Sequence, residues 1–474
     1  MLPVRPAPEV AVPSVTTLDP PAQPEPERDI ERAPVPGPGP GPVMVATARA
    51  TYVYEAPDFS SRRLGYLRAG QVVRRATEPS GAAGCPGGFF EIVPRGHVCV
   101  GDWASLDPEH PAARQLSRRP DRSASLPYRY GLSRFPTPPF YTRVPSYSER
   151  ASQEPELHYH VRNLGGTGWN AAGFDAVPAM LLAGGSAPRF DGQSQAGTSL
   201  SSGRAIPGSG FAFMTLFASD GYEYGISTDL AVLPLDRVEP VEGSRFHGVR
   251  LEAERVLPLG FVRTRSAISY EDPRRRPAAT LRLLGFREAV ALNGNRVRVQ
   301  GSTYHEASAG GWIRDDQLVL VEPLSLAPSW VEPGRRWIDV SILRQTLVAY
   351  SGTEAVFATL VSTGKAGLSD ERGAPATIKG TFTIHTKHVT SHMSSNARGN
   401  AYDLRDVPYV QYFHEGFALH AAYWHDAFGA PRSHGCVNLS PEDARWLFEW
   451  TDPEVPPEWH GAYSTAGTRV HIHP

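Results

Sequence analysis

The chain has 474 residues, of which 41% are apolar and 10% aromatic, and its formal net charge is -2. Because a domain usually spans roughly 100 to 200 residues, this length predicts two to four domains, and the apolar content excludes a chain that is disordered throughout. No run of about 20 apolar residues predicts a membrane-spanning helix, and the near-zero charge offers no basic surface for nucleic acid. We therefore expect no transmembrane segment and no nucleic-acid partner.

Proline and glycine are abundant, at 45 residues each. Proline thus occurs at nearly twice its usual share of about 5%, which favours loops and β-structure over long helices. Thirteen prolines fall within residues 1–43, which we predict to be a Pro-rich disordered linker. Its first residues lack the apolar stretch of a secretory signal. We expect either a spacer behind a signal or lipid anchor that lies upstream, or a disordered cytosolic tail.

Residues 44–108 contain about five short β-type runs separated by turns, a pattern that predicts a small barrel. Four of these runs lie at 47–54, 65–73, 89–93 and 96–100. An opening strand with a Pro turn, two central glycines and a late aromatic strand resemble bacterial SH3-like domains. Residues 241–330 predict a second SH3-like module, with glycine and aromatic positions that echo the first. We expect both to be binding or spacer modules rather than enzymes, because neither brings together a nucleophile, a base and an orienting group.

The three cysteines divide into a close pair and a single residue. In an oxidising compartment Cys85 and Cys99 would form one disulfide and Cys436 would stay a free thiol, whereas in the cytosol all three would be buried thiols. In an SH3-like barrel the first two would lie on neighbouring segments within reach of each other.

Residues 109–240 predict an irregular β region with a long Gly/Ser-rich loop between Gly184 and Gly210. A strand pair at 210–218 and 222–228 follows this loop. Its connection, Ser219-Asp220-Gly221, is a strong hairpin signal because Asp-Gly suits a tight turn.

Residues 335–474 open with three alternating strands at 337–340, 345–350 and 355–361. Ten of the sixteen histidines also fall in this segment, which indicates local chemistry. Further along, Ser440-Pro441 followed by two acids predicts the start of a short helix, with a serine cap and a proline in the first turn.

One stretch joins the lone cysteine to two histidines. A thiol with a pKa of about 8.5 is mostly protonated at neutral pH, so a neighbouring imidazole must accept its proton, and His420 is our candidate base for Cys436. The separation of 16 positions between them allows a strand, a turn and a return strand. Gly435 lacks a Cβ and lets backbone amides approach an oxyanion, while His434 would share a face with Cys436 if the segment is extended.

The motif Ser433-His-Gly-Cys-Val-Asn438, with His420 upstream, resembles the catalytic signature of L,D-transpeptidases of the YkuD type. Gly380-Thr-Phe-Thr-Ile384, Gln411-Tyr-Phe413 and Tyr423-Trp-His-Asp426 support the resemblance. By this resemblance Cys436 is the nucleophile, His420 the general base, and Ser433, His434, Gly435 and Asn438 shape the site, with His434 as a further catalytic candidate. Tyr412 and Tyr423 are expected to be aromatics of the core or of the pocket wall, the alternative being a role at the oxyanion. At the position after the base, Ala421 stands where family members often have Gly or Ser. The side chain matters little there, because the family uses the backbone carbonyl of this residue to orient the imidazole of the base. Thr377-Ile-Lys-Gly380 replaces a common Thr-Pro-Thr-Gly, which affects the local turn.

The resemblance implies a mainly β chain, in which a β-sandwich-like catalytic domain with a short helix follows small SH3-like β-barrels. The implied activity is acyl transfer. The cysteine forms a thioester with a peptidoglycan stem tetrapeptide and releases its D-alanine, and the acyl group then passes to an amine on a second stem peptide or an envelope protein. The implied location is the bacterial cell envelope. We expect no cofactor and no metal. Three alternatives stay open: an L,D-carboxypeptidase acting on the same peptides, a zinc hydrolase using His471 and His473, and a noncatalytic wall-binding protein.

Overall fold

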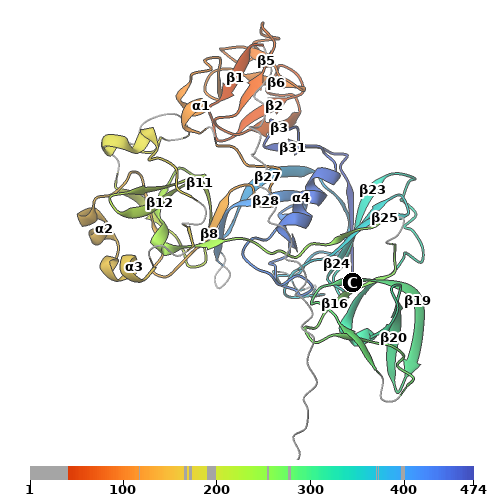
Figure 1. The fold of residues 1–474 in the computed structure, drawn as a ribbon. Coiled ribbons are helices and arrows are strands. Elements are labelled where there is room, and N and C mark those ends of the chain that lie inside the picture. Colours follow the sequence, from red (N-terminus) through yellow and green to blue (C-terminus); the bar gives the residue numbers. More distant parts are fainter. Residues whose placement is uncertain are drawn as a thin grey trace, which may run out of the picture. The chain divides into compact units, whose positions relative to one another are not determined.

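The computed structural model describes residues 41–474 except 117, 165–167, 170–172, 189, 191–198, 253–255, 276–278, 370, 372 and 397–400. Gly41–Pro474 forms one compact unit (Figure 1). The predicted linker up to residue 40, and part of the predicted Gly/Ser-rich loop, lie outside the described residues. Strands far outnumber helices, which confirms the mainly β class. Within the described part of the chain, no helix is both long and apolar enough to cross a membrane.

The first segment contributes a three-stranded sheet and four strands at one end of a sixteen-stranded sheet. Its elements are β1 (Val43–Ala46), β2 (Thr51–Tyr54), β3 (Arg63–Leu67), β4 (Val72–Arg74), β5 (Phe89–Glu91), β6 (His97–Cys99), β7 (Ala104–Ser105) and α1 (Pro111–Gln115). The strand orders are β4-β1-β7 and β3-β2-β6-β5, and neither is a closed barrel, which corrects that part of the prediction. The reason is that the outer edge of β3 pairs with the distant strand β31 (Gly461–Tyr463) instead of closing on its own segment.

In its described residues the middle segment has seven strands, each paired with at least one other, and most of the short helices. Its elements are β8 (Arg129–Ser133), β9 (Pro139–Tyr141), α2 (Tyr147–Gln153), α3 (Leu157–Leu164), η2 (Ala179–Gly184), β10 (Ser201–Arg204), β11 (Gly210–Ser219), β12 (Tyr222–Ser227), β13 (Val232–Pro234), η3 (Leu235–Arg237) and β14 (Val238–Val241). The predicted hairpin is confirmed: Ser219 pairs with Tyr222, and Asp220 and Gly221 between them both have positive φ, as a tight hairpin turn requires.

The next segment is a seven-stranded sheet. Its elements are β15 (Val249–Arg250), β16 (Leu259–Val262), β17 (Ile268–Tyr270), β18 (Thr280–Leu283), β19 (Ala289–Val299), β20 (Ser302–Ala307), β21 (Trp312–Arg314), η4 (Asp315–Gln317) and β22 (Leu318–Val321). The order β18-β17-β21-β20-β19-β16-β22 has two free ends, so this predicted barrel is also an open sheet among the described residues. β15 lies outside it and pairs with β25 of the last segment.

The last segment is a two-sheet sandwich with one helix, as predicted. Its elements are β23 (Arg336–Ser341), β24 (Thr346–Ser351), β25 (Glu354–Leu360), β26 (Gly380–Thr383), β27 (Thr386–Ser395), β28 (Tyr402–His414), β29 (Phe417–Ala421), β30 (Val437–Leu439), α4 (Pro441–Trp450), β31 and β32 (Arg469–His473). One sheet has the order β15-β25-β24-β23-β32-β26, and β27 to β31 belong to the other. Their inner faces share one apolar core, which also contains Leu447 and Phe448 of α4.

Helix α4 begins where the sequence predicts. The Ser440 hydroxyl accepts a hydrogen bond from the backbone N–H of Asp443, and Pro441 occupies the first helical position. At the other end, buried Lys387 of β27 donates to the carbonyl oxygens of Phe448 and Thr451. Burial lowers the pKa of Lys387 to about 7. Both ends of the helix are therefore satisfied by side chains.

The buried carboxylate of Asp406 on β28 joins three segments. It forms an ion pair with Arg68 of the first segment and accepts hydrogen bonds from Thr228 of the middle segment and Thr390 of β27. The main-chain oxygen of Asp406 accepts a further bond of 2.7 Å from Tyr130. Burial raises the pKa of the Asp406 carboxyl, but the charge and hydrogen bonds of Arg68 outweigh it and hold this pKa below its usual range. The strand that leads to the β28–β29 hairpin is thus anchored from outside the last segment.

Candidate active site

A cavity of about 350 Å³ contains the predicted nucleophile and base. Two of its lining residues, Leu132 and Gly208, come from the middle segment, and the others come from the last segment. These are Met393, Tyr402, Leu404, His420, Trp424, Arg432, Ser433, His434, Cys436 and Asn438. The sequence motif and its upstream histidine therefore line one cavity.

His420 is held as one tautomer. It lies on β29, and its Nδ1 is 2.9 Å from the main-chain oxygen of Ala421. Nδ1 must carry the proton to donate to this carbonyl, which leaves Nε2 as the unprotonated nitrogen. Burial lowers the pKa of His420 to about 4, while the bond to Ala421 acts weakly in the other direction. The imidazole is thus neutral at physiological pH and able to accept a proton.

Cys436 is a free, half-buried thiol immediately before β30. Its S–H donates to the main-chain oxygen of Gly416, with Sγ 3.6 Å away. Burial raises the pKa of the thiol to about 11. At neutral pH the cavity therefore contains a neutral thiol and a neutral imidazole.

The turn that presents Cys436 is fixed from two sides. The Ser433 hydroxyl accepts from the backbone N–H of Gly435 at 3.0 Å and donates to the main-chain oxygen of Cys436. Buried Thr377 donates to the Gly435 carbonyl at 2.8 Å. Gly435 has a φ of +138°, and a Cβ there would lie 2.8 Å from the ring of Phe417. Any larger residue would displace the nucleophile's turn.

The connection from His420 to Cys436 differs from the predicted strand, turn and return strand. β30 runs parallel to β29, with His420 opposite Asn438, and the residues between the strands form a loop. Residues 434–436 are bent rather than extended. A parallel partner needs a connection that returns to the starting end of the sheet, so the intervening chain crosses over instead of pairing.

His434 lies at the exposed rim of the cavity. Its Nε2 is 3.4 Å from Nζ of Lys365, and its ring packs against Tyr402. Burial, and then the charge of Lys365, lower the pKa of His434. The structure thus places this predicted catalytic residue in the exposed part of the cavity lining, in contact with a lysine and a tyrosine.

The two predicted tyrosines do not line the cavity. Tyr423 is buried in the core, where its ring centroid is 4.4 Å from that of Tyr130 and its hydroxyl faces the Arg405 carbonyl at 3.4 Å. Tyr412 lies half-buried on β28, and burial raises the pKa of its hydroxyl. Tyr423 is therefore a core aromatic, which is one of the two placements expected for these tyrosines.

Seven residues of the cavity lining were not among the predicted site residues: Leu132, Gly208, Met393, Tyr402, Leu404, Trp424 and Arg432. The position of Arg432 directly before the Ser-His-Gly-Cys motif was the available signal. Leu132 and Gly208 lie more than 200 residues before Cys436, and no local pattern links them to it.

The two histidines near the C-terminus, which could have been zinc ligands, each form a hydrogen bond to another side chain. His471 contacts Thr381 at 2.9 Å, and His473 contacts Asp339 at 3.1 Å. In the described ranges, no group of three or more His, Cys, Asp or Glu side chains could hold a metal ion. Cys85 and Cys99 form a disulfide, so Cys436 is the free cysteine of the chain.

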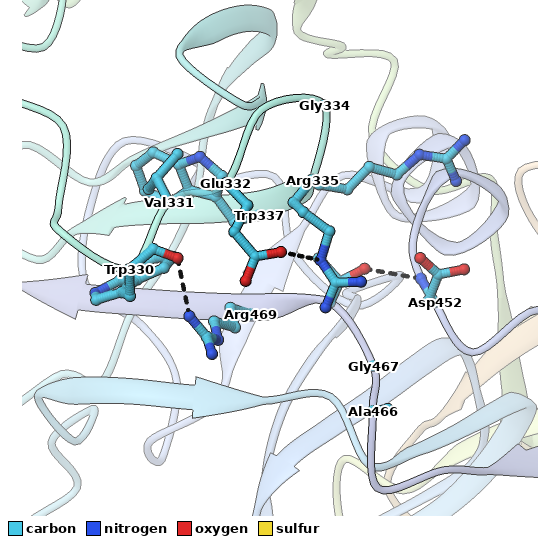
Figure 2. Close-up of a pocket in the computed structure, with 12 residues that line it drawn as sticks. Trp330, Val331, Glu332, Gly334, Arg335, Trp337, Asp452, Ala466, Gly467 and Arg469 are labelled. Carbon is cyan, nitrogen blue, oxygen red and sulfur yellow. Dashed lines mark hydrogen bonds and ion pairs between the residues drawn. The ribbon is translucent and has the colours of Figure 1, made fainter.

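A second, smaller cavity of about 150 Å³ lies where residues 330–337 meet 466–469. Figure 2 shows the Arg469 guanidinium directed at the main-chain oxygen of Trp330, a bond of 3.1 Å. Glu332 and Arg335 form an ion pair along its wall. Its lining contains no cysteine or histidine, and none of its residues is shared with the cavity at Cys436.

Comparisons with known proteins place the last segment in a family. Residues 335–472 match the model of the L,D-transpeptidase catalytic domain, YkuD. No curated protein matches the chain. Among solved structures, an L,D-transpeptidase from Xylanimonas cellulosilytica is 22% identical, with 31% of this chain and 65% of that chain covered and a TM-score of 0.22.

Two further structures give similar values. An L,D-transpeptidase from Stackebrandtia nassauensis is 25% identical, with 32% and 62% of the two chains covered and a TM-score of 0.22. The catalytic domain of the E. faecium L,D-transpeptidase is 21% identical, with 30% and 98% covered and a TM-score of 0.23. This chain therefore spans somewhat less than two thirds of the first two relatives. The family-model match confirms the resemblance that the motif indicated: residues 335–472 are a YkuD-type L,D-transpeptidase catalytic domain.

Proposed function

We propose that the chain is a peptidoglycan L,D-transpeptidase in which Cys436 is the nucleophile and His420 the general base. The observation that carries the proposal is their shared cavity, together with the bond from His420 Nδ1 to Ala421 that leaves Nε2 free to accept a proton. The substrate is a stem tetrapeptide, and the scissile bond joins its third residue to D-alanine. The chain acts in the bacterial cell envelope.

In the first half of the reaction, Sγ of Cys436 attacks the peptide carbonyl while its proton moves to His420 Nε2. The carbonyl electrons form an oxyanion, and their return breaks the C–N bond. His420 then gives its proton to the departing D-alanine nitrogen, leaving a thioester. In the second half an amine attacks the thioester, His420 removes the amine proton, and the sulfur leaves as the thiolate and recovers a proton as the thiol.

The test is acylation followed by turnover. Imipenem should add once to the native chain and not to Cys436→Ala, as intact-protein mass would show. The native chain, incubated with a disaccharide tetrapeptide, should then release D-alanine and give a cross-linked dimer, while EDTA should have no effect. If only a shortened tripeptide appears, the chain is the L,D-carboxypeptidase. A folded native chain that forms no adduct and releases no D-alanine would contradict the proposal.

A further inference from the structure

The cavity at Cys436 has one cationic side and one apolar side. Arg432 is the charged residue in its lining, where no carboxylate occurs. Throughout the described residues, no hydrogen bond or ion pair engages its guanidinium, although its backbone N–H donates to Thr363 at 2.9 Å. Leu132, Met393 and Leu404 supply apolar lining. Such a cavity favours a ligand that carries a negative charge on a short aliphatic body.

A second donor in the cavity follows from the contacts of His425. The backbone N–H of Ala427 donates to Nδ1 of His425 at 3.2 Å, so Nδ1 is the unprotonated nitrogen. Burial, and then the charge of Arg432, lower the pKa of His425 to about 4. The ring is therefore neutral near pH 7 and carries its proton on Nε2, which lies 3.0 Å from the side-chain amide of Asn438.

Two donors cannot face each other, so the amide oxygen of Asn438 must face His425. The amide NH2 group is then the end without a partner. Asn438 is 2% exposed and lines the cavity, and the end of its amide away from His425 has no hydrogen-bond partner within the described structure. A buried polar group of this kind is costly unless a ligand satisfies it.

We propose that Arg432 and the Asn438 amide form a carboxylate subsite in the cavity, and that His425 is a positioning residue that orients the amide. This inference rests on the proposed function, because it names the group that the subsite would take: the free α-carboxylate of the D-amino acid that leaves. The guanidinium fork matches a carboxylate, the amide adds a neutral donor, and the apolar lining receives the alkyl part. The subsite would favour a peptide that ends directly after the scissile bond over one whose terminal carboxylate is amidated.

Two alkylating reagents that differ mainly in charge test the subsite without needing transpeptidation. Iodoacetate and iodoacetamide each form an S–C bond with the Cys436 thiolate and release iodide, and the disulfide removes the other two cysteines from the reaction. The measurement is the ratio of the two rates, iodoacetate over iodoacetamide, by intact-protein mass. Arg432→Gln should lower this ratio at least threefold at low ionic strength. Arg245→Gln is the matched control, since Arg245 is a highly exposed arginine outside the cavity lining, and it should leave the ratio unchanged.

Variants of the amide pair test the orientation. Asn438→Asp should lower the ratio further than Arg432→Gln, because His425 still donates to one oxygen and the other brings a negative charge into the cavity. His425→Phe should lower the ratio and His425→Gln should restore it, since glutamine can accept from Ala427 and donate to Asn438. The iodoacetamide rate alone reports whether the thiol stays accessible, so a merely structural defect would move both rates together.

An unchanged ratio in Arg432→Gln and Asn438→Asp would overturn the subsite. If iodoacetamide does not react with the native chain, the accessible thiol of the proposed function fails instead. The subsite is then tested in Cys436→Ser by thermal unfolding with N-acetyl-D-alanine and with its amide at equal ionic strength. Stabilisation by the acid only, lost on adding Arg432→Gln, would support the subsite, and equal effects of both compounds would overturn it.

Discussion

At the scale of single residues, the chemistry depends on two groups whose ionisation is suppressed. Burial lowers the pKa of His420 to about 4 and raises that of Cys436 to about 11. Between these values both groups are neutral, so the thiol is not stored as a thiolate that stray oxidants could attack. Under the proposed function, Cys436 would become a nucleophile only when a substrate carbonyl is in place.

This suppressed ionisation predicts the pH dependence of acylation. The rate constant for imipenem at Cys436 should rise through pH 4 to 5, as His420 loses its proton, and stay level from about pH 6 to 9. His420→Gln should lower the plateau by about 10²-fold or more and remove the acid limb. Stopped-flow absorbance or timed mass spectra across this pH range provide the measurement. A rise centred near pH 8.5 would instead indicate attack by a preformed thiolate.

Buried neutral histidines also predict how stability depends on pH. Burial lowers the pKa of His460 to about 3 and that of His420 to about 4, below the unfolded value of about 6.5. Since the unfolded chain binds more protons below pH 6.5, their contribution is complete above that pH and is lost as the pH falls toward 4. The free energy of unfolding should fall by up to about 1.4 kcal/mol per pH unit for each histidine. Urea unfolding at several pH values should give a shallower slope for His460→Gln, and an equal slope would contradict the assignment.

At the scale of elements, the sequence predicts those strands, turns and helix ends that depend on residues close together in the chain. Alternation predicted β23, β24 and β25, Asp220-Gly221 predicted the hairpin of β11 and β12, and the Ser440 cap predicted α4. The parallel pairing of β29 and β30, and the pairing of β3 with β31, depend on contacts between distant residues. Local patterns carry no information about such partners, and the same limit explains why Leu132 and Gly208 were missed at the cavity.

The C-terminal end of α4 offers a test at this scale. Lys387→Met removes the donor to the carbonyl oxygens of Phe448 and Thr451 and leaves both buried without it. We expect a loss of about 1–3 kcal/mol in the free energy of unfolding. Lys379→Met, at an exposed lysine shortly before β26, is the control and should change stability little. Chemical denaturation compares the two, and equal midpoints would show that Lys387 does not cap the helix.

At the scale of the whole molecule, the segments are joined through buried polar contacts as well as through sheets. Arg68→Met leaves the Asp406 carboxylate buried without its cation, and such a change typically costs about 3–5 kcal/mol. Adding Asp406→Asn should recover part of the loss, because the uncompensated charge disappears. A double-mutant cycle from denaturant unfolding measures the coupling. Additive losses would mean that the two side chains act independently.

The contribution of the middle segment to the cavity gives a second prediction at this scale. Leu132 lies on β8 opposite Gly210 of β11 and packs against the core that contains Leu404 and Tyr423. Leu132→Ala should lower imipenem acylation of Cys436 about fivefold to tenfold by removing apolar contact with the ligand. Alkylation by iodoacetamide, which is too small to need that wall, should keep its rate. A parallel fall in both rates would place the effect in the fold rather than in ligand contact.

The shared sheet has a practical consequence for dissecting the molecule. One sheet runs through β11, β28, β27, β31 and β3, so strands of the last segment lie between strands of two others. Cutting the chain before Arg335 would strip β11 from β28 and β3 from β31, exposing unpaired backbone groups along both. Unpaired strand edges of this kind tend to pair with those of other molecules, which leads to aggregation. A soluble minimal enzyme should therefore need the preceding segments supplied, either in the same polypeptide or by co-expression as a second chain.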